Sequence, residues 1–168
     1  MSSTDSVGPP PFPWLFTSVE NPISGKNHPQ GRTVYRPVVP VTLVGPEEEN
    51  AATFLALVDS GCERCLAAPG IARQIGVEPD AALQVPMKIG GDRRMARPAE
   101  VTLRLAPEQG EDHVEWQAEV DFFTEWTGPP WQVLLGQIGF FDQFTVTFSR
   151  SARQLAIEAA AEFDRRWR

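Results

Sequence analysis

A carboxylate that directly follows a buried strand is the feature of this sequence best suited to chemistry. Asp59 comes after the apolar run Thr53–Val58 and is followed by Ser60 and Gly61. An apolar run of this length is typical of a buried strand, so Asp59 is expected at the end of a rigid element. The glycine allows a sharp turn, and the serine hydroxyl can bond neighbouring backbone groups. Asp-Ser-Gly is also a common turn, so these three residues alone do not establish catalysis.

Two further segments lie later in the chain. Arms over 84–89 and 94–105 flank Gly90-Gly91-Asp92, a pattern that predicts a hairpin with a glycine tip. The apolar run Val133-Leu134-Leu135 ends at Gly136 and predicts a second buried strand. A short helical turn and a last hairpin, with arms over 144–148 and 154–157, are expected after it.

The order and spacing of these segments resemble the retropepsin-like (retroviral-type) aspartic protease family, in its bacterial single-domain form. The family motif of two apolar residues before Asp-Thr/Ser-Gly is matched by Leu57-Val58-Asp59-Ser60-Gly61, and its apolar-apolar-Gly strand end by Leu134-Leu135-Gly136. The similarity extends over about Tyr35 to Ile157. It implies three groups of site residues, with no metal or cofactor: catalytic Asp59, Ser60 and Gly61; a substrate-binding flap of Ile89, Gly90, Gly91 and Asp92; and structural support from Leu134, Leu135 and Gly136.

The resemblance also implies a quaternary structure. Aspartic proteases use two close carboxylates that share one proton, whereas this chain has a single Asp-Ser-Gly and only 168 residues. A homodimer with Asp59 from each subunit is therefore expected, acting as an endopeptidase on peptide or protein substrates. The alternatives are a catalytically silent dimeric module of the same type that binds peptides or partner proteins, and a redox switch at Cys62 and Cys65 on a β scaffold.

Composition favours an all-β protein. The 13 glycines and 16 prolines fit a loop-rich fold, which we predict to be a small closed β-barrel with one or two short helices. A net charge of −7 argues against a nucleic-acid partner. No apolar stretch approaches the roughly 18 residues of a membrane span, and the first residues carry no basic signal region. A cytoplasmic protein without membrane or nucleic-acid partners is therefore expected.

Three regions are predicted along the chain. They are a proline-rich tail over 1–31, a domain over 32–158, and a helical C-terminal extension over 159–168. Ordered structure is expected from about Thr33, with polyproline geometry or disorder before it. The apolar cluster of Phe12, Trp14, Leu15 and Phe16 is expected to pack on its own domain or on a dimer mate rather than to bind a separate ligand. Pro37 and Pro40 predict an edge strand or a bulged strand over 34–44.

The cysteines, the arginines and the other aspartates considered for the site are interpreted as structural or solvent-exposed residues. Ordinary packing is favoured for Cys62 and Cys65 over a redox pair or a metal site, since a zinc site would need two more ligands. Solvated positions are expected for five aspartates and three arginines, with a basic flap selective for acidic peptides as the alternative for the arginines. These residues are Asp80, Asp92, Asp112, Asp121 and Asp142, and Arg93, Arg94 and Arg97.

Overall fold

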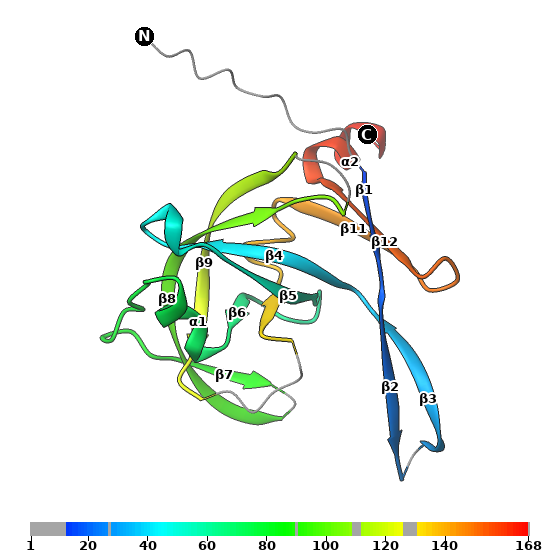
Figure 1. Cartoon of the computed structure of the whole chain (residues 1–168), viewed down its shortest axis with the longest axis horizontal. Coiled ribbons are helices and arrows are strands. Elements are labelled where there is room, and N and C mark those ends of the chain that lie inside the picture. The colour runs from blue at the N-terminus through cyan, green and yellow to red at the C-terminus, as the bar shows by residue number, and fades with distance from the viewer. Residues whose placement is uncertain (1–12, 27, 90, 109–111, 126–130, 168) are drawn as a thin grey trace.

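A closed barrel of six strands forms the body of the protein in the computed structural model (Figure 1). The structure describes residues 13–26, 28–89, 91–108, 112–125 and 131–167. Hydrogen-bonded neighbours around the barrel are, in order, β4 (Val38–Val44), β5 (Ala52–Val58), β10 (Val133–Leu135), β6 (Cys65–Ala67), β9 (Val114–Phe123) and β8 (Asp92–Leu105). Pairing of β8 with β4 closes the ring, and β7 (Val85–Ile89) extends β8 as a hairpin arm. The predicted small closed β-barrel is confirmed.

Strands also form before residue 33, so the predicted polyproline geometry or disorder is wrong for the described residues from Trp14 onward. In β1 (Trp14–Thr17) the side chains alternate between buried and exposed, and Trp14 and Phe16 are only 5% and 1% exposed. The strand pairs with β12 (Gln154–Ala159), which in turn pairs with β11 (Phe144–Ser149). The expected packing of this cluster on its own domain is thus confirmed for these two side chains, whereas Leu15 is 52% exposed and Phe12 lies outside the described residues.

A two-stranded ribbon of β2 (Val19–Gly25) and β3 (His28–Arg36) projects away from the barrel (Figure 1). Pro37 separates this ribbon from β4. The predicted edge or bulged strand over 34–44 is wrong: residues 34–36 belong to β3, and β4 pairs in regular register with β5 on one side and with β8 on the other. Pairing with β8 begins only at Val41, so Pro40, which lacks an N–H, occupies the one-sided part of the strand.

The helical elements are short. The helix α1 (Pro69–Gln74) begins at a proline and is followed by Gly76, whose φ of +68° suits a residue without a side chain. A 3-10 turn, η1 (Glu48–Asn50), precedes β5, and α2 (Ala160–Trp167) continues from β12. No helix of the described residues is long and apolar enough to cross a bilayer.

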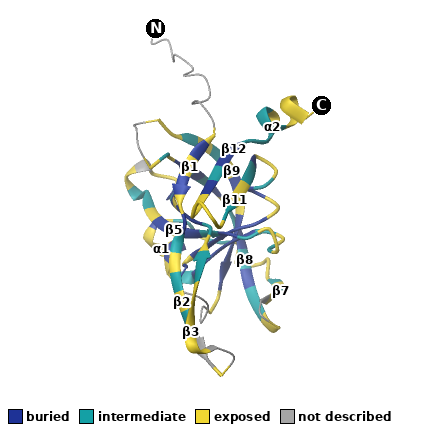
Figure 2. Ribbon diagram, turned by 90° about the vertical axis from the view of Figure 1, so that its right-hand side faces the viewer, coloured by how far each residue is buried: buried dark blue, intermediate teal, exposed yellow. Residues whose placement is uncertain are grey.

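The main core fills the barrel interior and extends beneath the β1–β12–β11 sheet (Figure 2). Phe140, Phe144 and Trp116 form a cluster of ring contacts at this junction, with centroid separations of 4.9–6.1 Å. A second, smaller cluster of Leu66, Ala96, Phe123 and Leu134 is separate from this core. The smaller cluster is the one beside the candidate site.

Candidate active site

The strand β10 is inserted between β5 and β6, two strands that are consecutive in the barrel part of the chain. It is parallel to β5, with Leu135 opposite Val58, and antiparallel to β6, with Leu134 opposite Leu66. The loop from Asp59 to Arg64 must therefore cross the end of β10. The Asp59 N–H donates to the Leu135 carbonyl at 3.0 Å, which ties the start of the loop to the inserted strand.

Gly136 makes this crossing possible. A Cβ at residue 136 would lie 2.3 Å from the Arg64 carbonyl oxygen and 2.8 Å from that of Cys62, so no larger residue fits without movement of the backbone. Immediately beyond it, the N–H groups of Gln137 and Ile138 donate to the carbonyls of Cys62 and Glu63 at 2.9 and 2.8 Å. The three residues predicted to support the site thus lie directly against the Asp59 loop.

Backbone donors hold Asp59 at the centre of the loop, one through its carboxylate and one through its main-chain carbonyl. Asp59 Oδ1 accepts a hydrogen bond from the Gly61 N–H at 2.9 Å, and the Asp59 carbonyl accepts one from the Cys62 N–H at 3.0 Å. Gln137 Nε2 donates to the Ser60 carbonyl at 2.7 Å from the other side of the crossing. Asp59 is partly buried, whereas Ser60 and Gly61 are exposed. The aspartate therefore has a fixed position at a surface that a second molecule can reach.

The predicted glycine-tipped hairpin is formed by β7 and β8. Ile89 pairs with Asp92, so the second arm begins two residues earlier than the sequence predicts. Gly91 has a φ of +94°, as a tight two-residue connection requires, while Gly90 lies outside the described residues. Asp92 is exposed and its carboxylate is 3.6 Å from the Arg94 guanidinium. The role of this hairpin in binding substrate stays a prediction.

A cavity of about 610 Å³ separates the Asp59 loop from the hairpin. Asp59, Gly61 and the following loop residues line one wall, and the β7 residues from Val85 to Lys88 line the opposite wall. Leu134 contributes from the smaller apolar cluster, against which Cys62 and Met87 also pack. Among the described residues that line this cavity, the hairpin contributes only its β7 arm, and Gly91 and Asp92 at the tip are not among them.

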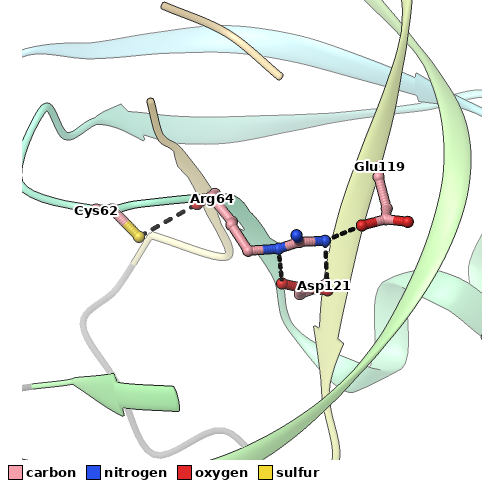
Figure 3. Close-up of polar contacts among 4 residues, drawn as sticks. All are labelled: Cys62, Arg64, Glu119 and Asp121. Atoms are coloured by element: carbon pink, nitrogen blue, oxygen red, sulfur yellow. Dashed lines mark hydrogen bonds and ion pairs between the residues drawn. The ribbon is translucent and has the colours of Figure 1, made fainter. Parts of the chain in front are cut away.

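A buried ion pair lies beside the loop (Figure 3). Arg64 Nε donates to Asp121 Oδ2 at 2.5 Å, and its Nη2 contacts both Asp121 Oδ1 and the carboxylate of Glu119. Asp121 is 0% exposed, so its predicted solvated position is wrong; the other four aspartates of that prediction are exposed. The strand alternation does place Asp121 on the polar face of β9. At residue 121 the Arg64 guanidinium lies against the carboxylate, and β6 pairs alongside β9 there, with Leu66 opposite Asp121.

Burial and pairing act in opposite directions on these charges. Burial raises the pKa of the Asp121 carboxyl, and the hydrogen bonds and charge of Arg64 offset only part of this rise. Partial burial of Arg64 lowers its pKa, but the hydrogen bonds to Asp121 and Glu119 outweigh that effect and the pKa is raised. The sequence carries no local signal for this pair, because its two members are 57 positions apart.

The two cysteines are free thiols packed on opposite sides of the loop. Cys65 belongs to the main core and is fully buried, which raises the pKa of its thiol to about 12. Cys62 packs against the smaller cluster and its Sγ donates to the Arg64 carbonyl at 3.2 Å; burial raises its pKa as well. The packing interpretation is confirmed. Within the described residues, no three His, Cys, Asp or Glu side chains gather in a way that would hold a metal ion.

The sequence was compared with known proteins in two ways. Neither the protein-family models nor the curated proteins compared with the sequence give a match.

Proposed function

We propose that this protein is a retropepsin-like aspartic endopeptidase that acts as a two-fold homodimer. One observation carries the proposal: Asp59 is held at the end of β5 by the β10 crossing and faces a cavity whose opposite wall is a hairpin arm. A carboxylate that accepts a backbone N–H, next to a site large enough for several peptide side chains, suits a reaction that depends on preorganised groups.

The proposed reaction needs a second carboxylate, which the same loop of another subunit would supply. Two close aspartates cannot both ionise easily, so the pair would hold one shared proton. The ionised member accepts a proton from water while the water oxygen attacks the peptide carbonyl carbon. The protonated member donates to the carbonyl oxygen. Collapse of the resulting diol breaks the carbon–nitrogen bond: the carboxyl that took the water proton gives it to the leaving amine, and the other carboxylate takes a proton from a diol hydroxyl. This leaves the carboxyl product and restores one shared proton on the pair.

The loop hydrogen bonds support this role because they leave one carboxylate oxygen of Asp59 uncommitted within the described residues. Oδ1 accepts the Gly61 N–H, whereas Oδ2 makes no hydrogen bond there. Motion of the carboxylate is further limited by the Gln137 contact with Ser60. A group already oriented in this way needs little reorganisation when charge develops at the substrate.

Substitution of Asp59 by Asn tests the proposal. Asp80 provides a matched control, because its Oδ1 also accepts the N–H two residues ahead, from Ala82 at 2.8 Å, and it lines no part of the Asp59 cavity. Cleavage of an unfolded, fluorescently labelled protein is followed between pH 4 and 7, the range of shared-proton pairs. Loss of the acid–base group should lower the rate by a factor of about 10² to 10⁴ in Asp59→Asn, and Asp80→Asn should cleave like the wild type.

Sedimentation equilibrium on the same three proteins examines the dimer. All three are expected to be dimers with the same circular dichroism. A wild-type dimer that cleaves nothing over this pH range would contradict the proposal and favour a catalytically silent module that binds peptides. Full cleavage by Asp59→Asn would remove Asp59 from the reaction altogether.

A further inference from the structure

A second cavity, of about 630 Å³, lies between α1, the segment that follows it, and the adjoining parts of β8 and β9. It shares no lining residue with the cavity at Asp59. Ala72 of α1 and Phe122 of β9 contribute apolar surface, and the charged side chains around it are Arg73, Glu78 and Arg97. Its size is in the range of small-molecule sites. It is therefore a separate place where a ligand of mixed apolar and polar character fits.

Arg97 is the unusual residue in this cavity. It lies on β8 directly opposite Phe122 and is partly buried, as is Arg94, so the solvated position predicted for the three arginines holds only for Arg93. Its Nε is buried and has no hydrogen-bond partner, and among the described residues its guanidinium forms no ion pair. By contrast, Arg64 is paired with two carboxylates. Because Arg97 lines the cavity, an anion bound there can supply the pairing that its guanidinium lacks among the described residues.

The charges around the cavity limit what that acceptor can be. Arg73 and Arg97 contribute two positive charges and Glu78 one negative charge, so the lining has a net charge of about +1. A monoanion balances this charge, whereas a phosphate dianion would leave a negative excess in a partly apolar site. The planar guanidinium fork matches a carboxylate, and the aromatic and proline surface suits a flat apolar body.

We propose that this cavity binds a small organic monoanion, a carboxylate on a flat apolar body, with Arg97 as the residue that recognises the carboxylate. The proposal is independent of catalysis at Asp59, because the two cavities have no residue in common. Arg73, exposed at the rim of the cavity, adds long-range attraction for the anion.

Calorimetric titration of the full chain with sodium 2-naphthylacetate tests the proposal, with the neutral 2-naphthylacetamide and inorganic phosphate as comparison probes. The carboxylate should bind the wild type at least about tenfold more tightly than the amide, because only the carboxylate forms a hydrogen-bonded charge pair with Arg97. Phosphate should bind more weakly than the carboxylate. Equal binding of the carboxylate and the amide, no heat from the carboxylate at millimolar concentration, or tighter binding of phosphate would each overturn the proposal.

Two variants and a control locate the site. Arg97→Gln should weaken naphthylacetate binding by about tenfold or more, and Arg73→Gln, an exposed change that leaves the fold intact, by a smaller factor. Arg150→Gln, in an exposed turn, should bind like the wild type. Because Arg97 is unpaired, its replacement should not lower the melting temperature of the protein. Wild-type affinity in both Arg97→Gln and Arg73→Gln would place the ligand elsewhere and contradict the inference.

Discussion

The buried pair of Arg64 and Asp121 gives a prediction about stability that can be worked from the structure. Arg64→Met keeps most of the apolar stem and removes the guanidinium. Asp121, with no exposed surface, then keeps its position without its partner. Breaking a buried pair from one side costs about 3–5 kcal/mol, against a total free energy of unfolding of about 5–15 kcal/mol for a domain. Arg64→Met should therefore unfold at a much lower urea concentration than the wild type at pH 7.

The pH dependence of this loss follows from the pKa of Asp121. Burial raises it above the unfolded value, so the folded protein binds more protons than the unfolded chain between the two pKa values. The stability that Asp121 contributes is thus present below its unfolded pKa and is lost as the pH rises through the folded one. Removal of Arg64 raises the folded pKa further. The deficit of Arg64→Met should consequently shrink as the pH is lowered from 7 towards 4.

Urea unfolding curves at several pH values, followed by circular dichroism, measure both effects. Asp121→Asn in the Arg64→Met background should recover much of the loss at pH 7, because no unpaired charge remains. Glu119→Gln is the control: its side chain is 49% exposed, and loss of an exposed pair costs about 0–1 kcal/mol. An Arg64→Met variant within about 1 kcal/mol of the wild type at pH 7, or with the same deficit at every pH, would refute the reasoning.

Two further predictions concern residues that pack beside the Asp59–Arg64 loop. The pKa of the Cys65 thiol is raised from 9.0 to about 12, so the stability that this thiol contributes is complete below pH 9 and is lost as the pH rises towards 12. Between pH 7 and 10 the free energy of unfolding of the wild type should fall by about 1.4 kcal/mol more than that of Cys65→Ala, measured by urea unfolding. Equal losses in the two proteins would contradict the raised pKa. Gly136→Ala should lower the free energy of unfolding by about 1–3 kcal/mol and abolish cleavage, because the added methyl group meets the Arg64 carbonyl. Gly70→Ala is the control: no atom lies within 4 Å of its added carbon, so stability and cleavage should be unchanged or slightly raised. A stable and active Gly136→Ala would show that the crossing tolerates a side chain.

Local signals made much of the barrel and the Asp59 loop predictable. The apolar runs at Thr53–Val58 and Val133–Leu135 identify strands because their side chains must leave water, and glycines identify the turns that need unusual backbone angles. The prolines around β1 and β2 led to a prediction of polyproline geometry or disorder, whereas strands form in this region. A short strand such as β1 has little intrinsic preference, and its pairing with β12, about 140 positions away, decides its conformation.

The sequence by itself determined the apolar runs of the two strands that flank the candidate site, and that a single Asp-Ser-Gly directly follows one of them. Only the tertiary structure decided which charges are buried. Asp121 and Glu119 occupy equivalent alternating positions on β9 and both pair with Arg64, yet the Asp121 side chain has no exposed surface and that of Glu119 is 49% exposed. The sequence likewise predicts Arg97 as a solvated cation of a polar hairpin. In the structure, strand pairing places it opposite Phe122, where it lines a cavity. Periodicity reports which face of a strand a residue occupies, whereas burial depends on what distant part of the chain packs against that face.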